Sequence, residues 1–236
     1  QAQFGLKQRP LVVHNVSPRL ETVPARGRIQ QILTAQGIEA SCVFYYHGWI
    51  QRARCADAFI EALAGVPEGA VLFLVGQCEP ALRAALEARV AELGLGQRVV
   101  FHGTVHTDEL LPLAASADVG LQAQRNIGLN AYYCAPIKLF QYFAVGLPVI
   151  ASDFPGMRAL VADNDAGLCV DPESVEAIRT AMCTLAADPA LRVRMGANAR
   201  RLALERFHHA HEARPLLNFI LAQLDRPVLA EAERVT

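Results

Sequence analysis

The stretch NIGLNAYYCAPIKLFQYFAVGLPVIASD, residues 126–153, decides how this 236-residue chain folds. It begins as a polar loop, after which Pro136 opens a short helix that ends before Gly146. An apolar run at residues 148–152 predicts a buried strand, and residues 117–121, just before the stretch, predict another. A strand–loop–helix–strand unit with polar residues at the helix N-terminus is the arrangement with which α/β proteins hold a phosphorylated ligand.

Lys138 stands out at this helix N-terminus because of the composition of the chain. Of the 22 Lys and Arg residues only Lys7 and Lys138 are lysines. Lysine carries a compact point charge with three donors, whereas arginine presents a planar fork, so a lysine here indicates a specific contact. On composition alone, a surface lysine without a role is the alternative.

Composition excludes several classes of function. With 53% hydrophobic and 19% charged residues the chain can bury a large core, and a net charge of −1 gives no basic field for nucleic acid or an anionic membrane. No apolar run is long enough to cross a bilayer. The six cysteines form no CxxC pair, which favours a reducing compartment. No metal is expected, because His208, His209 and His211 are more typical of a solvated helix than of a metal site.

Apolar runs alternate with segments of helical period along most of the chain. The runs predict strands at residues 11–14, 42–47, 71–75, 98–101, 117–121, 148–152 and 167–170. The helical segments are 28–36, 53–64, 80–93, 108–115, 136–145, 173–187, 189–206 and 210–224. This alternation predicts an α/β fold, a Rossmann-like parallel sheet flanked by helices on both faces. We expect a linker or N-terminal extension at residues 1–40, a ligand-binding domain at 41–207, and a C-terminal helix and tail at 208–236.

The residues that follow each strand are candidate ligand contacts, because ligands of doubly wound sheets bind at the carboxyl ends of the strands. Glycine recurs at these positions and lets a ligand approach the backbone, although each glycine also serves a turn. The chain has no GxGxxG and no GxxxxGK[ST] sequence. A nicotinamide or flavin cofactor and a P-loop nucleotidase are therefore disfavoured. Two predicted strands, at residues 42–47 and 98–101, are followed by such candidates. They are Gly48, Arg52, Arg54, Gly103, Thr104 and Val105.

Five motifs occur together in an order and spacing that resemble one known family. They are HGW-x4-RC-x-D at residues 47–57, FLVG at 73–76, RVVFHGTV at 98–105, ADVGL at 117–121 and PIKLFQYFAVGLPVIASD at 136–153. They look like the C-terminal, donor-binding half of a GT-B glycosyltransferase, most similar to the retaining family-4 enzymes (glycosyl transferases group 1). The match covers roughly residues 42–206. A chain that starts with Gln and lacks a signal peptide is then expected to be part of a longer or processed protein.

The resemblance implies transfer of a sugar from a nucleotide diphosphate sugar, of the UDP or GDP type, to a glycan or lipid-linked acceptor. It implies retention of configuration and no bound cofactor. It also suggests a bacterial cytoplasmic enzyme of polysaccharide or lipopolysaccharide biosynthesis, with possible association at the inner face of the plasma membrane. The acceptor-side catalytic residues would lie outside this chain, so they are unknown, and the chain alone is expected to lack turnover.

The resemblance also implies roles for the candidate residues. Arg54, with Arg52 as a stand-in, would neutralise the pyrophosphate beside the Gly48 loop, and the base would rest near Gly103, Thr104 and Val105. Asn130 would contact the sugar and the distal phosphate. Lys138 would neutralise the leaving diphosphate. All ten candidates are then Gly48, Arg52, Arg54, Gly103, Thr104, Val105, Asn130, Tyr133, Lys138 and Gln141.

Two positions depart from the family pattern. Glutamates are expected where this chain has Tyr133 and Gln141. An amide can still hydrogen-bond a ribose diol, but it is neutral and has distinct donor and acceptor ends. Two alternatives therefore stay open: a degenerate glycosyltransferase that acts as a nucleotide-sugar-binding or partner subunit, and a nucleotide-sugar 2-epimerase.

The apolar face of the predicted helix at residues 210–224 suggests a further partner. In a complete GT-B enzyme this helix would pack on the N-terminal domain. In this chain it would pack on its own domain or on a second copy, which would make a homodimer.

Overall fold

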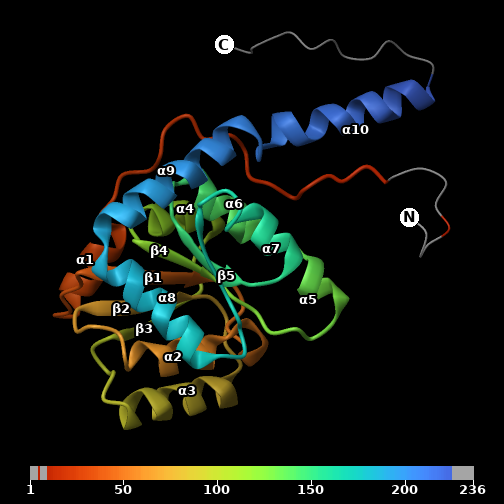
Figure 1. The fold of residues 1–236 in the computed structure, drawn as a ribbon. Helices are drawn as coiled ribbons and strands as arrows, with labels where there is room; N and C mark the ends of the chain where they lie inside the picture. The colour runs from red at the N-terminus through yellow and green to blue at the C-terminus, as the bar shows by residue number, and fades with distance from the viewer. Residues whose placement is uncertain (1–4, 6–9, 225–236) are drawn as a thin grey trace.

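The computed structural model describes Gly5 and residues 10–224, and a six-stranded parallel sheet forms its centre (Figure 1). The strand order is β3-β2-β1-β4-β5-β6. Several strands are buried along their whole length on both faces, which is why they read as continuous apolar runs in the sequence. The six strands predicted between residues 42 and 170 are confirmed. They are β1 (Cys42–His47), β2 (Ala70–Val75), β3 (Val99–Gly103), β4 (Val119–Gln122), β5 (Val149–Ser152) and β6 (Gly167–Val170).

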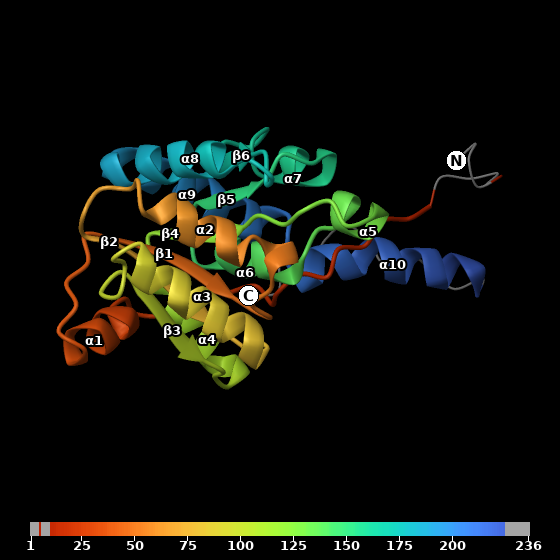
Figure 2. The same cartoon turned by 90° about the horizontal axis from the view of Figure 1, so that it is seen from below.

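Helices cover both faces of the sheet, as predicted (Figures 1 and 2). The core on one face is shared with α1 (Arg28–Ala35), α4 (Thr107–Ala115), α6 (Ile137–Ala144), α7 (Pro155–Leu160) and α9 (Pro189–Glu205). The core on the other face is shared with α2 (Ala56–Leu63), α3 (Pro80–Glu92) and α8 (Val175–Ala187). The short elements η2 (Arg52–Arg54) and α5 (Leu129–Tyr133) follow β1 and β4, and α10 (His209–Gln223) follows α9.

The strand predicted at residues 11–14 is wrong. This segment has no secondary structure and lies outside the sheet, with Val12 65% exposed. Its partner is a helix rather than a strand: the backbone N–H of His14 donates to Glu212 of α10 over 2.8 Å. Two helices, α5 and α7, were not predicted, because five and six residues are too few to show a helical period.

The segment at residues 16–38, expected as a connector, packs against the sheet. Val16, Ile29 and Leu33 are buried in the same core as the sheet residues. The hydroxyl of Ser116 accepts the N–H groups of Gly27 and Arg28 at the start of α1. These contacts join α1 to the end of α4, and the domain boundary at residue 40 stays a prediction.

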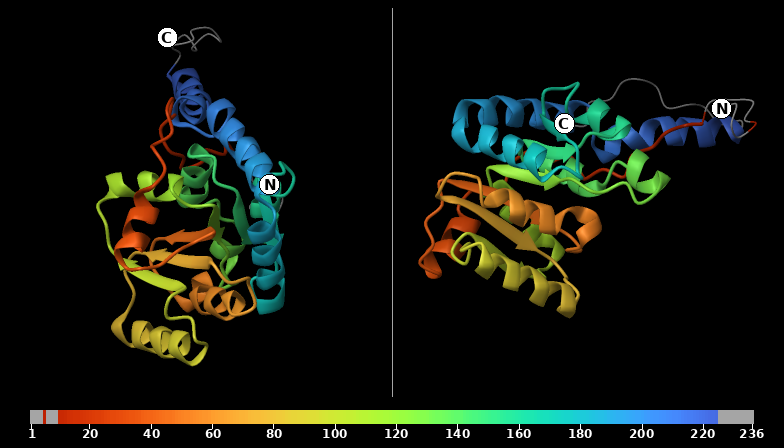
Figure 3. Two further views of the ribbon diagram at one scale, coloured as in Figure 1. Left: turned by 90° about the vertical axis from the view of Figure 1, so that its left-hand side faces the viewer. Right: turned by 60° about the horizontal axis from the view of Figure 1, so that its bottom comes forward.

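Helix α10 extends away from the sheet, beside the segment that contains His14 (Figure 3). None of its residues is buried. The predicted apolar face is therefore exposed in the described structure. Its members are Leu216, Leu217, Phe219, Ile220 and Leu224. Among the described residues, no helix is long and apolar enough to span a membrane.

Candidate functional site

The strand order reverses direction between β1 and β4. The chain winds outward from β1 through β2 to β3 and then returns to place β4 on the other side of β1. The loops that leave β1 and β4 therefore run to opposite faces, and they leave a crevice at the carboxyl end of the sheet. Two cavities lie at this end, and both are lined by residues that follow β1.

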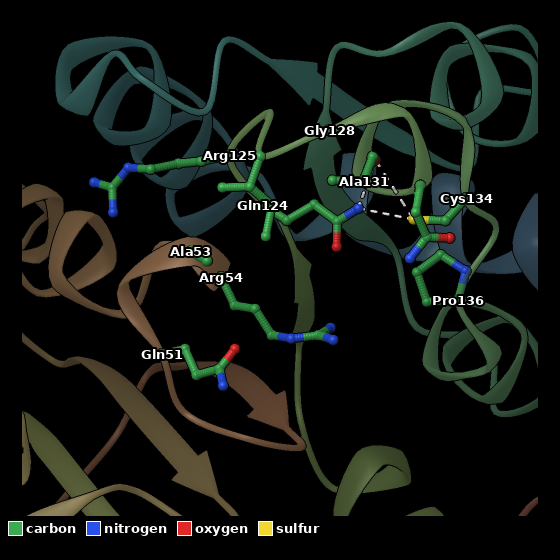
Figure 4. A pocket seen from close by; sticks show the side chains of 11 residues that line it. Gln51, Ala53, Arg54, Gln124, Arg125, Gly128, Ala131, Cys134 and Pro136 are labelled. Atoms are coloured by element: carbon green, nitrogen blue, oxygen red, sulfur yellow. Dashed lines mark hydrogen bonds between the residues drawn. The ribbon is translucent and has the colours of Figure 1, made fainter.

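The first, which we call the switch-point cavity, has a volume of about 330 Å³. It lies between η2 after β1 and the loop and α5 after β4 (Figure 4). The guanidinium of Arg54 extends into it and forms no ion pair with any described residue. The lining residues are Gln51, Ala53, Arg54, Gln124, Arg125, Ile127, Gly128, Asn130, Ala131, Cys134 and Pro136.

Gln124 holds the far wall of the switch-point cavity in place. Its side-chain nitrogen donates to the carbonyl of Ala131, 2.7 Å away, and its backbone N–H donates to the hydroxyl of Ser152. These bonds attach α5 to the ends of β4 and β5, while the amide oxygen of Gln124 faces the cavity (Figure 4). The short α5 is thus held by a buried polar side chain, and the ring of Tyr132 on α5 also packs against Phe154 with 5.0 Å between ring centres.

Two arginines near this cavity are already paired. Arg125 forms ion pairs with Asp57 at 3.0 Å and with Glu173, and Figure 4 shows its guanidinium directed away from the cavity. Arg52 pairs with Asp57 and lines a separate hollow against α3, outside the switch-point cavity. Arg54 is therefore the arginine of this group with a charge free for a ligand.

The second, which we call the histidine cavity, has a volume of about 280 Å³. It is built from the ends of β1 and β2, the turn after β3 and Leu110 of α4, and two glycines, Gly48 and Gly76, are part of its wall. No residue in its wall carries a full charge while His47 is neutral. The lining residues are His47, Gly48, Trp49, Val75, Gly76, Gln77, Thr104, Val105 and Leu110.

Lys138 lies where the two cavities approach each other. Its ammonium stands 3.8 Å from the centre of the Tyr46 ring, a cation–π contact, and a Cβ added to Gly48 would lie 3.3 Å from it. Burial, and next the charge of Arg54, lower the pKa of Lys138 well below its usual range. No carboxylate of the described residues offsets this effect. A buried cation without an acidic partner is costly, and an anionic ligand would offset that cost.

His47 and Gln141 form a hydrogen bond at the edge of the histidine cavity. The Nε2 of His47 lies 2.9 Å from the Oε1 of Gln141. Burial, reinforced by the charge of Lys138, lowers the pKa of His47 to about 3, so the imidazole is neutral at physiological pH. The other ring nitrogen, Nδ1, is buried without a hydrogen-bond partner in the described structure.

The structure brings most of the candidates from the sequence together at this end of the sheet. Gly48, Thr104 and Val105 line the histidine cavity, and Arg54 and Asn130 line the switch-point cavity.

The remaining candidates lie around the two cavities. Lys138 and Gln141 contact lining residues, and Gly103 ends β3 directly before Thr104. Arg52 and Tyr133 line neither cavity; the Tyr133 side chain is exposed on α5 and its ring contacts Tyr132.

Sequence reasoning missed His47 and Gln124 as site residues. His47 ends β1 and Gln124 lies two residues after the end of β4, and these positions were the available signal. Among the described residues, no group of three or more His, Cys, Asp and Glu side chains could hold a metal ion.

This doubly wound sheet, with its crevice and buried cation at the carboxyl ends of the strands, defines a Rossmann-like ligand-binding domain. The profile of one family, glycosyl transferases group 1, matches residues 41–188. The chain therefore belongs to the glycosyl transferases group 1, and its fold is the C-terminal domain of a GT-B glycosyltransferase.

Several known proteins are similar to this chain. It is 32% identical over 168 residues to the GDP-mannose-dependent alpha-(1-6)-phosphatidylinositol monomannoside mannosyltransferase of Mycobacterium tuberculosis, a match that covers 70% of this chain and 43% of that protein. It is 29% identical to the D-inositol 3-phosphate glycosyltransferase of Xylanimonas cellulosilytica, over 68% of this chain and 37% of that protein. The chain thus spans about two fifths of the length of these relatives.

Solved structures share the fold at lower identity. Anabaena HepE in complex with UDP-glucose is 20% identical with a TM-score of 0.71, covering 82% of this chain and 52% of that one. The C-terminal domain of the group 1 glycosyl transferase LpcC from Francisella tularensis is 22% identical with a TM-score of 0.64. That match covers 78% of this chain and 95% of the LpcC domain, so the region shared with this chain corresponds to one complete domain.

Proposed function

We propose that this chain is the donor-binding half of a glycosyltransferase that takes a sugar from a nucleotide diphosphate sugar. The observation that carries the proposal is the pair of cations, Lys138 and Arg54, that lies at the carboxyl end of the sheet without acidic partners in the described part of the chain. A diphosphate is the ligand group that such a pair neutralises best, and Gly48 leaves the backbone open beside them.

The two cavities suit the two ends of such a donor. The nucleoside would occupy the neutral histidine cavity, against the turn of Thr104 and Val105. The sugar would occupy the switch-point cavity, beside Gly128 and Asn130. The diphosphate would then lie between them, at the buried ammonium of Lys138. HepE has been solved with UDP-glucose and the mycobacterial relative is named as GDP-mannose-dependent, which supports a donor of the UDP or GDP type.

The reaction that we propose retains the configuration at the anomeric carbon. The bond from the anomeric carbon to the diphosphate oxygen breaks, and the acceptor oxygen bonds to the same face of that carbon. The proton of the acceptor hydroxyl passes to the leaving diphosphate, whose growing charge Lys138 and Arg54 stabilise. The acceptor, a glycan or a lipid-linked sugar, would be held by the part of the enzyme outside this chain. The chain alone then binds donor without turnover.

A thermal-shift series tests the proposal. UDP, GDP and their sugars are added to the chain, and each ligand that binds only the folded state raises the melting temperature. We expect UDP or GDP to raise it more than the corresponding nucleoside monophosphate, because the second phosphate reaches the two cations. No shift with any nucleoside diphosphate at millimolar concentration would count against the proposal.

One observation favours a second candidate, a degenerate glycosyltransferase that binds nucleotide sugars without transferring them. Gln141 occupies the position where the family pattern has a glutamate, and its oxygen is already bonded to His47. The Gln141→Glu variant of the complete enzyme separates the two candidates. A large gain in transfer would indicate a decayed site, and an unchanged or lower rate would indicate a site adapted to the amide.

A further inference from the structure

The hydrogen bond between His47 and Gln141 joins two residues that are 94 positions apart in the chain. His47 ends β1, is 5% exposed, and packs edge-on against the ring of Tyr142 with 5.2 Å between ring centres. Gln141 lies on the first turns of α6 and is partly exposed. A buried imidazole held by packing therefore contacts an amide that a ligand can still reach.

The surroundings of His47 determine where its single hydrogen lies. The ring is neutral, because burial and the charge of Lys138 both lower its pKa. A neutral imidazole has one N–H donor and one bare nitrogen. The atom opposite Nε2 is the oxygen of Gln141, an acceptor, so Nε2 carries the hydrogen and donates it. Nδ1 is then a bare acceptor, and a buried acceptor without a partner is tolerated better than a buried donor without one.

This bond fixes which end of Gln141 meets a ligand. The amide oxygen faces the imidazole, and the amide nitrogen has no hydrogen-bond partner among the described residues. The two N–H groups of the amide remain for the ligand. A glutamate in this position could only accept hydrogen bonds, whereas the fixed amide mainly donates them.

We propose that His47 is a positioning residue that holds Gln141 with its N–H groups toward the donor nucleotide, so that the site selects a hydrogen-bond acceptor on the pentose. The inference rests on the proposed function, which puts the nucleoside in the histidine cavity and the diphosphate at Lys138. Gln141 lies about one helical turn after Lys138 on α6 and contacts His47 at the edge of that cavity. The part of the nucleotide nearest to Gln141 is then the pentose, which joins the base to the diphosphate. The pentose oxygen that contacts Gln141 acts as an acceptor in this protein, which is the reverse of its role toward a carboxylate.

Nucleotide analogues test this polarity. Fluorine has nearly the size of a hydroxyl group, accepts a weak hydrogen bond and donates none. UDP or GDP, whichever gives the larger thermal shift, is compared by calorimetry with its 2′-fluoro-2′-deoxy and 3′-fluoro-3′-deoxy analogues. We expect the wild-type chain to lose no more than about threefold in affinity with either analogue, and Gln141→Glu to lose about tenfold or more with one of them. An equal loss in both proteins would overturn the proposal.

Two variants of His47 separate positioning from simple packing. His47→Phe keeps an aromatic ring of similar size but cannot donate, so the amide is free to rotate and we expect about fivefold weaker nucleotide binding. His47→Gln keeps a donor and is expected to recover most of the affinity. Equal affinities for His47→Phe and wild type would contradict the proposal.

A measurement without ligand makes the test independent of the proposed function. Nitrogen NMR of the histidine ring in the wild-type chain should show the neutral form with hydrogen on Nε2 from pH 5 to 8. Hydrogen on Nδ1, or a doubly protonated ring, would overturn the inference even if nucleotides bind. If the ring has the expected form and no nucleoside diphosphate binds, the proposed function fails, and so does the ligand contact assigned to Gln141.

Discussion

The two cavities at the carboxyl end of the sheet differ in how they are built. The histidine cavity is formed by strand ends and glycine backbone, and its one titratable side chain is held neutral by burial. The switch-point cavity is formed by loops and the short α5, and it contains the guanidinium of Arg54, which has no ion-pair partner among residues 10–224. Rigid backbone thus makes the uncharged half of the site, and long side chains make the charged half. A ligand with a neutral group in the histidine cavity and an anionic group between the two cavities, within reach of Arg54, would use both halves.

Of the substitutions considered, one at Gly76 should have the largest effect, because it disturbs the backbone that forms the histidine cavity. This glycine has φ +132°, and a Cβ added to it would collide with the carbonyl oxygen of Gly48. We expect Gly76→Ala to lower the free energy of unfolding by roughly 3 kcal/mol or more, since backbone rather than a flexible side chain must move. Gly103→Ala is the control, because Gly103 also has a positive φ but open space around its Cβ. That variant should cost about 1–2 kcal/mol in urea unfolding, and equal costs would show that the collision is not decisive.

A substitution of Lys138 tests whether its charge contributes to ligand binding. We expect Lys138→Met to weaken binding of UDP or GDP by roughly 30-fold to 100-fold, the value of a charge-assisted contact at a buried site. The same variant should melt at a higher temperature without ligand, because it removes a buried cation without an acidic partner. Arg52→Met removes the same charge from an exposed site outside both cavities and serves as the control. Equal weakening by both variants would contradict a specific role for Lys138.

The neutrality of the histidine cavity predicts a pH dependence of stability. The folded-state pKa of His47, about 3, lies below its unfolded value of 6.5, so folding favours the neutral ring. Its contribution to stability is complete above pH 6.5 and is lost as the pH falls toward 3. Relative to His47→Gln, the wild type should lose about 2 kcal/mol of unfolding free energy between pH 7 and pH 5. A constant difference between the two proteins over this range would show that the pKa of His47 is not lowered by folding.

A substitution of Arg54 tests whether the charged switch-point cavity and the neutral histidine cavity bind different parts of the ligand. We expect Arg54→Gln to weaken binding of the nucleoside diphosphate by roughly tenfold while binding of the free nucleoside stays unchanged. The reason is that the guanidinium extends into the switch-point cavity and not into the histidine cavity. Calorimetry with UDP and uridine, or with GDP and guanosine, measures both values. An equal loss for the nucleoside would mean that the cavities are not independent.

Much of the fold follows from local sequence patterns. Apolar runs predict β1 and β6 with their observed bounds, and β1 is buried along its whole length, as expected of a strand covered on both faces. The apolar run at residues 11–14 misleads, since its partner is the distant Glu212 and not a strand. The helices α5 and α7 were missed because their short sequences have no visible period, and α5 is attached by contacts with distant residues such as Gln124 and Phe154.

Some residues of the candidate site could be identified from the sequence, and others could not. Gly48 and Thr104 could be found from the sequence, because the ends of parallel strands meet at one edge and the residues that follow them line it. Asn130 was a candidate through the resemblance to the family pattern, and it lines the switch-point cavity. The sequence could not separate Arg52 from Arg54, since η2 turns one toward Asp57 and the other toward the cavity.

By itself, the sequence determined the order of strands and helices and the residues at the carboxyl edge of the sheet. It also determined membership of the glycosyl transferases group 1, since these features depend on neighbours in the chain and on motif spacing. Only the tertiary structure decided that Lys138 lies buried over Tyr46 and that the amide of Gln141 faces His47. The physical reason is that the direction and charge state of a side chain are set by packing between elements that are far apart in the sequence.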